Sequence, residues 1–96
     1  MIVNERQTPK GLLVSVCDRE VLGETFENGD VSITVNEEFY GGEEVDESAV
    51  ESTLARASVG NLVGERSVSI AIEEGHVKEA NVLDIDGTPH AQFLRM

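Results

Sequence analysis

The stretch Asp46–Gly75, DESAVESTLARASVGNLVGERSVSIAIEEG, decides the fold. It contains two blocks with apolar residues at helical spacing, and the glycine-bounded segment Gly60–Gly64 between them predicts a loop joining two short helices. The segments before and after it have strand patterning and need a layer that covers one face. The sequence therefore predicts a single α+β domain over residues 1–96, with a mostly antiparallel sheet of hairpins covered by two short helices.

The first helix is predicted to begin near Ser48. This serine and Glu51 have the spacing of a capping box, and Asp46 is an alternative cap. Gly60 is expected to end the helix, because glycine adopts the left-handed conformation after a last turn at low cost.

The second helical block, Glu65–Glu74, can be interpreted in two ways. Val68, Ile70 and Ile72 alternate as a strand would, but the apolar spacing also suits a buried helix. We favour the helix, because an acidic residue suits a helix start and Gly75 suits its end.

Four further segments have the alternation or the turn signals of strands. They are Ile2–Arg6, Leu12–Cys17, Asn81–Ile85 and Thr88–Leu94. The first two are predicted to form one hairpin, and Asp86-Gly87 closes a second, tight one. In the second hairpin the expected pairs are Ile85–Thr88, Leu83–His90 and Val82–Ala91. Both faces of that hairpin are then partly apolar, so the sheet is either covered on both sides or offers a face to a partner.

The segment between Cys17 and the first helix is more irregular. Asp18 can cap a short helical turn, and Val31–Val35 alternates as a half-buried strand should. Phe39 and Tyr40 stand in the glycine-containing stretch Glu37–Val45. Such aromatics either plug a core or present a binding surface, and the plug is the commoner role.

The net charge is the most unusual property of the composition. Nineteen acidic residues against seven basic ones give a formal charge of −12. This balance disfavours direct nucleic-acid binding, without excluding it, because a cationic stripe supplies most non-specific affinity. It is also typical of proteins from salt-loving archaea, where a Debye length of about 3 Å at molar salt screens the repulsion.

Cys17 is the only cysteine, so neither an internal disulfide nor a cysteine-rich zinc knuckle can form. The chain has no run of the roughly 18 apolar residues that a membrane span needs, and we expect a soluble, cytoplasmic protein. His76, His90 and the carboxylates lack the spacing of metal-binding motifs, so no metal or cofactor is predicted.

Cys17 and His90 are the one pair that offers a thiolate and a base. Cys17 ends a strand just before a helical turn, where amide dipoles can lower a thiol pKa. A catalytic dyad would require contact between the two side chains, and the sequence does not establish it. The alternative is a half-buried structural thiol and a surface histidine.

The segment Asn61–Gly64 precedes a helix start, where backbone amides can approach an anion. Residues 62–68 also resemble the glycine loop with which the KH module grips RNA backbone. Ser67 replaces the second glycine of that loop and Arg66 is its sole cation. The alternative is a tight connector between two helices.

Several segments of the chain occur together in a familiar order. They are Leu13–Asp18, Leu22-Gly23, Phe39–Gly42, Ala57 with Asn61–Glu65, Ala71–Gly75 and Gly87–Gln92. Together they resemble the archaeal domain of unknown function 424 (DUF424) family over nearly the whole chain. The resemblance implies an archaeal cytoplasmic protein and, with the acidic composition, a member from a salt-loving archaeon. It implies no activity.

The leading hypothesis is a non-enzymatic accessory or binding module that acts through a protein or ribonucleoprotein partner. Its expected contact surface contains Asn61, Gly64, His90 and Gln92. The hypothesis is based on the small size of the chain, the absence of a complete catalytic constellation, and polar residues on a strand that otherwise has apolar neighbours. A thiol-dependent enzyme and anion or RNA-backbone binding at Gly64 are the alternatives. Neither the ligand nor the oligomeric state follows from the sequence.

Overall fold

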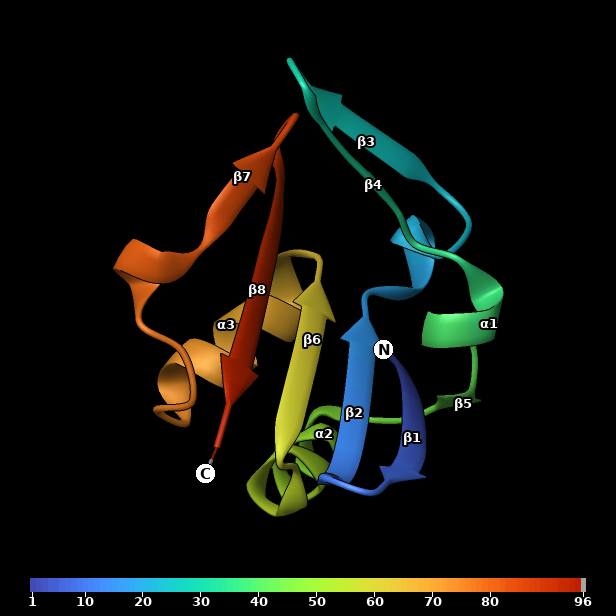
Figure 1. The fold of residues 1–96 in the computed structure, drawn as a ribbon, viewed down its shortest axis with the longest axis vertical. Helices are drawn as coiled ribbons and strands as arrows, with labels where there is room; N and C mark the ends of the chain where they lie inside the picture. The colour runs from blue at the N-terminus through green and yellow to red at the C-terminus, as the bar shows by residue number, and fades with distance from the viewer. Residues whose placement is uncertain (96) are drawn as a thin grey trace.

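The structure is a computed structural model that describes residues 1–95. Strands, α-helices and two short 3₁₀ turns (η) follow one another along this part of the chain (Figure 1). They are β1 (Ile2–Thr8), β2 (Gly11–Cys17), η1 (Arg19–Val21), β3 (Thr25–Asn28), β4 (Val31–Thr34), α1 (Glu37–Tyr40), β5 (Glu43–Glu44), α2 (Glu47–Arg56), β6 (Val59–Val63), α3 (Glu65–Glu73), η2 (Glu79–Asn81), β7 (Leu83–Ile85) and β8 (Thr88–Leu94).

The main sheet has the strand order β5-β1-β2-β6-β8-β7, and β3 and β4 form a separate hairpin. All strand pairs are antiparallel except β2 with β6, which is parallel. The predicted α+β class with a mostly antiparallel sheet is therefore confirmed, as are the hairpins β1–β2 and β7–β8. The parallel pair at the centre was not predicted.

The predicted loop Gly60–Gly64 is wrong, because residues 59–63 form the central strand β6. Helix α2 ends at Arg56 rather than near Gly60, and the Ser58 amide already donates to the Leu12 carbonyl oxygen at 2.8 Å. Leu62 and Val63 are both fully buried, on opposite faces of the sheet. Where a strand is buried on both faces, as at Leu62 and Val63, apolar residues do not alternate with polar ones, so the segment resembles a connector in the sequence.

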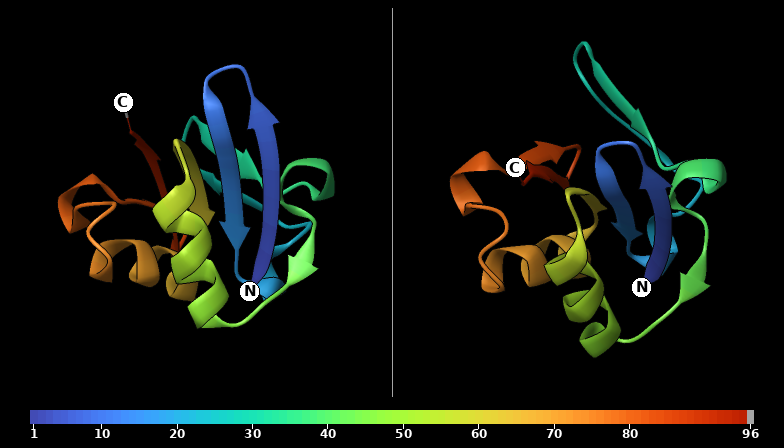
Figure 2. Two further views of the ribbon diagram at one scale, coloured as in Figure 1. Left: turned by 90° about the horizontal axis from the view of Figure 1, so that it is seen from below. Right: turned by 60° about the horizontal axis from the view of Figure 1, so that its bottom comes forward.

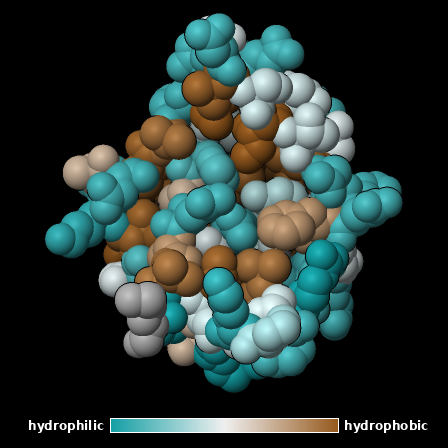
Figure 3. Space-filling view, viewed as in Figure 1, coloured by the Kyte–Doolittle hydropathy of each residue, from teal (hydrophilic) through white to brown (hydrophobic). Residues whose placement is uncertain are grey.

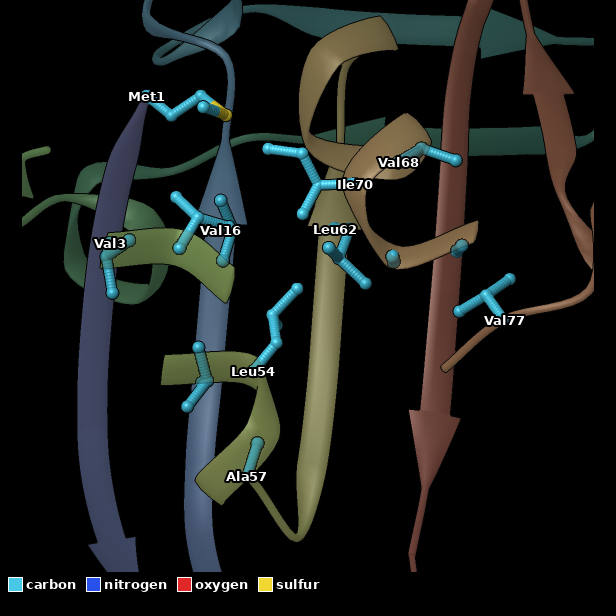
Figure 4. Close-up of a cluster of buried hydrophobic side chains, with 13 residues drawn as sticks. Met1, Val3, Val16, Leu54, Ala57, Leu62, Val68, Ile70 and Val77 are labelled. Atoms are coloured by element: carbon cyan, nitrogen blue, oxygen red, sulfur yellow. The ribbon is translucent and has the colours of Figure 1, made fainter. Parts of the chain in front are cut away.

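Helices α2 and α3 pack on one face of the sheet and lie behind it in Figure 1. Asp46, not Ser48, caps α2, since its carboxylate accepts from the Ala49 amide at 3.0 Å. The helix predicted over residues 65–74 is confirmed as α3. Together the two helices close the larger core, shown in Figure 4. Its buried members are Met1, Val3, Val14, Val16, Val50, Leu54, Ala57, Leu62, Val68, Ile70, Ala71, Val77 and Ala91.

The opposite face of the sheet is covered only in part. A smaller core contains Cys17, Val63 and Tyr40, with the β3–β4 hairpin and α1 packed against it. Tyr40 is 4% exposed, so this aromatic side chain is a core plug, and the irregular stretch around it contains α1 and β5. Figure 2 shows the β3–β4 hairpin extending away from the helical layer.

The predicted strand Asn81–Ile85 is shorter than expected. It begins at Leu83, whose pairing with His90 is confirmed, and Asn81 belongs to η2. The expected pair of Val82 with Ala91 is absent from the described ladder, because the chain leaves the sheet at Val82 and turns into η2.

Candidate functional site

We name the uncovered part of the sheet, away from α2 and α3, the open face. Its residues are Leu13, Ser15, Val59, Asn61, His90, Gln92 and Leu94. Figure 3 views the molecule from this side and shows apolar patches around a hydrophilic centre.

Ser15, Asn61 and Gln92 lie side by side in the middle of the open face. The register pairs Ser15 of β2 with Asn61 of β6, and Asn61 with Gln92 of β8. Asn61 is 7% exposed and Ser15 2%, yet neither side chain hydrogen-bonds to another residue of the described chain. Within residues 1–95 no side-chain polar atom is sealed from solvent without a partner, so the Asn61 amide must reach the surface. It offers donors and an acceptor that only water or a ligand can satisfy.

The Asn61 amide opens into a hollow of about 440 Å³. Val59, Gln92, Phe93 and Leu94 complete its lining. Leu94 is 69% exposed, the highest value among the large apolar residues within residues 1–95. The hollow therefore combines one almost buried amide, unpartnered within the described chain, with an apolar rim.

The open face also has an unusual charge distribution. On β1, β2, β6, β7 and β8, the side chains on this side of the sheet include no aspartate or glutamate among the described residues. The opposite side contains acidic residues such as Glu5 and Asp84. The one cation on the open side, Arg6, donates to the Glu38 carbonyl oxygen at 2.9 Å and lies over the ring of Phe39. In a chain of net charge −12, this face is nearly neutral.

His90 belongs to the same face, two residues before Gln92 on β8, between Val63 of β6 and Leu83 of β7. Burial lowers the pKa of its imidazole, which favours the neutral form of the ring. Leu83 is 57% exposed and extends the apolar rim of the open face toward the sheet edge.

The geometry does not support the thiol–imidazole pair. Cys17 pairs with Val63, and Val63 pairs with His90, so a valine stands between them. Strands are about 4.8 Å apart, which places the Cα atoms of Cys17 and His90 roughly 10 Å from each other. Cys17 is fully buried, and this burial, followed by the charge of Asp18, raises its pKa to about 11. A nucleophilic cysteine needs the opposite environment.

Asp18 has a role that the sequence did not indicate. It was expected to cap η1 but makes no side-chain bond there. Its carboxylate instead accepts from the Arg66 amide at 3.0 Å, the Ser67 amide at 2.9 Å and the Ser67 hydroxyl at 2.7 Å. Asp18 thus joins the end of β2 to the start of α3, and only 4% of it is exposed.

This cap removes the basis for an anion or RNA-backbone site at Gly64. A carboxylate already occupies the amides that a phosphate would use, and its charge repels another anion. Gly64 has φ +110°, and a side chain there would collide with Asp18. Its amide donates to the Pro89 carbonyl oxygen at 2.9 Å. Of the four predicted binding residues, Asn61, His90 and Gln92 share the open face, whereas Gly64 lies after the end of β6, at the N-cap position of α3.

Sequence reasoning missed Ser15, Val59 and Leu94 as members of this surface. The one local signal for Ser15 is its alternation with Val14 and Val16, which places it on the side of β2 away from the helices. The neighbourhood of the three residues depends on β6 lying between β2 and β8.

In the described part of the chain, no group of three or more His, Cys, Asp or Glu residues is arranged to hold a metal ion. No helix within residues 1–95 has both the length and the apolar character required to cross a membrane.

Comparisons with known proteins agree with this fold. Residues 5–96 match the family described as "Protein of unknown function (DUF424)". No curated protein matches the chain significantly. The chain is similar to a solved structure described as an uncharacterized conserved protein from Methanopyrus kandleri, with a TM-score of 0.78 and 20% sequence identity. The alignment covers 99% of this chain and 92% of that one, and it shows a shared fold.

Proposed function

Because the chain belongs to the DUF424 family, whose description assigns no activity, we propose its function from the open face: a non-enzymatic binding module that docks a protein partner there. The observation that carries the proposal is the almost buried, unpartnered Asn61 amide, which opens into a neutral, apolar-rimmed hollow. Interfaces between proteins are depleted of charge at their centre and place polar groups where a partner can satisfy them.

A protein partner, or the protein part of a ribonucleoprotein, fits this face better than nucleic acid does. RNA binding draws on cations that neutralise phosphates and on aromatic side chains that stack on bases. Arg6 is the single cation on this side of the described strands, and it is engaged by α1. The surrounding net charge of −12 would add repulsion.

The test uses two glutamines that both lie exposed on strands but on opposite sides of the sheet. Gln92→Glu places a negative charge in the middle of the open face, whereas Gln7→Glu places the same charge on the helix side of β1. Each tagged variant is purified from the native host at native salt, and bound proteins are quantified by mass spectrometry.

We expect a specific partner to be retained by the wild type and by Gln7→Glu, and to be lost from Gln92→Glu. Equal retention by the two variants, with both folded, would reject the open face as the docking surface. A partner that nuclease treatment releases from the wild type would indicate nucleic-acid-mediated association instead.

We infer further that the protein works in the cytoplasm of a salt-loving archaeon. The inference is supported by the charge of −12, because molar salt shortens the Debye length from about 10 Å to about 3 Å and screens acidic self-repulsion. The thermal unfolding midpoint should therefore rise between 0.1 M and 2 M KCl. A midpoint that stays constant or falls over this range would contradict the salt-adapted interpretation.

A further inference from the structure

The outer edge of β8 is only partly paired. The ladder with β7 covers Thr88 and His90 and ends there. Figure 1 shows β7 beside only one part of β8, with the chain before β7 turning away into η2. The second half of β8, toward Leu94, therefore forms an open edge of the main sheet on the described chain.

Two hydrogen bonds establish which main-chain groups point outward along this edge. The Gly64 amide donates to the Pro89 carbonyl oxygen at 2.9 Å, and the Arg95 amide donates to the Ser58 carbonyl oxygen at 2.8 Å. Because inward and outward groups alternate in an antiparallel ladder, residues 89, 91, 93 and 95 face β6. Gln92 and Leu94 consequently direct their N–H and C=O groups away from β6, where the described chain supplies no strand to receive them.

The two edges of the main sheet differ in charge. The β5 edge consists of Glu43 and Glu44, and charged side chains on an edge strand oppose pairing with another chain. The unpaired half of β8 has Gln92 and the exposed Leu94 on the open face, and no acidic residue between His90 and Leu94. One edge is thus protected, and the other is left neutral and apolar.

We propose that a second copy of this chain pairs with this edge, β8 against β8 in antiparallel orientation, about a twofold axis beside Phe93. Gln92 of each copy then lies opposite Leu94 of the other, and each such pair exchanges both N–H···O bonds. The two exposed Leu94 side chains become diagonal neighbours on the open face. The two open faces join into one continuous surface.

The charge pattern favours a second copy over a different partner. In a twofold interface each residue approaches its own copy, so any charge near the axis would meet a like charge. A neutral strip within a chain of net charge −12 meets this requirement. A partner selected by charge would instead use the acidic surface. The pairing does not depend on the docking function proposed above.

The first measurement is the mass of the purified full chain, by light scattering after size exclusion in 2 M KCl over a range of concentrations. One chain has a mass of 10.4 kDa, and we expect the measured particle mass to rise to twice this value as the protein concentration increases. A chain that stays monomeric up to about 1 mM would overturn the proposal, because its free energy of dimerisation would then be weaker than roughly −4 kcal/mol.

Amide exchange of the wild type locates the interface. We expect protection of the Gln92 and Leu94 amides to rise with protein concentration, at least tenfold in exchange rate between the monomeric and dimeric ranges. The Phe93 amide, which faces β6, is the internal control and should keep the same protection throughout. A dimer in which the Gln92 and Leu94 amides stay unprotected would place the interface elsewhere and refute the proposal.

Leu94→Pro supplies an independent test, because it removes an outward donor, and proline is tolerated at strand positions whose N–H faces away from the sheet. We expect a folded monomer. Leu94→Glu, which brings two like charges together near the axis, should weaken dimerisation at least tenfold and do so more strongly at low salt. A folded variant of either kind that dimerises like the wild type would overturn the proposal. Because these measurements use the purified chain alone, they are separate from partner retention.

Discussion

The carboxylate of Asp18 is the most informative single group to remove. It bonds the amides of Arg66 and Ser67, which follow it in the chain by 48 and 49 residues. These bonds join the central sheet to the helical layer. Asp18→Ala leaves the first amides of α3 without an acceptor and leaves the fully buried Ser67 hydroxyl without its partner. The loss is therefore larger than that of an ordinary helix cap.

The expected magnitude follows from the three bonds. Loss of a helix N-cap costs about 1 kcal/mol, and a buried hydroxyl left without a partner costs about 1–3 kcal/mol more. We expect Asp18→Ala to lower the free energy of unfolding by about 3 kcal/mol, a large part of the roughly 5–15 kcal/mol that holds a small domain together. In a domain of this size the thermal midpoint falls by roughly 12–24 °C.

Asp46→Ala is the matched control, because Asp46 caps α2 through a single bond to the Ala49 amide and is exposed. It should cost about 1 kcal/mol. Both variants are compared with the wild type by chemical denaturation at one fixed salt concentration. Equal losses for the two variants would refute the reasoning, since the buried bonds of Asp18 would then contribute nothing beyond capping. A double-mutant cycle with Ser67→Ala should show coupling of at least about 0.5 kcal/mol.

Three further outcomes are expected. In a denaturation assay, Gly60→Ala should lower the free energy of unfolding by about 1–3 kcal/mol, because the added methyl group would collide with the ring of Phe93. Phe93→Leu introduced into the same variant should restore part of this loss. Cys17 should be alkylated at pH 7 at least roughly 100-fold more slowly than free cysteine, because it is buried and its pKa is raised to about 11; reaction at the rate of free cysteine would contradict that burial. Burial first and then the Arg95 charge lower the pKa of His76, so Arg95→Gln should raise that pKa in an NMR titration, and an unchanged value would show that the two groups do not interact.

Local signals were sufficient for much of the fold. Asp86-Gly87 set the register of the last hairpin, because a two-residue turn leaves little choice of pairing. Helix α3 followed from its acidic start and from Gly75, which adopts φ +80° just past its end. These features depend on residues close together in the chain, so the sequence alone carries them.

The central strand could not be predicted in the same way. Residues 60–63 of β6 are all buried, so apolar residues do not alternate with exposed polar ones, and Gly60 with Gly64 just after the strand resembles loop punctuation. Its parallel partner β2 is distant along the chain, and no turn links the two. The same error affected the site, because with residues 60–64 interpreted as a loop nothing in the sequence places Ser15 beside Asn61.

Acidic residues are distributed unevenly between the two sides of the main sheet. If salt adaptation alone shaped the surface, acidic side chains would be expected wherever solvent reaches the protein. Leu94 is 69% exposed and Leu83 is 57% exposed, yet they and Gln92 lie on a side of the sheet with no acid on β1, β2 and β6–β8 in the described chain. The exposed area of these leucines contributes no burial free energy in an isolated monomer. A surface that stays neutral and apolar within so acidic a chain is the pattern from which we propose contact with another protein surface.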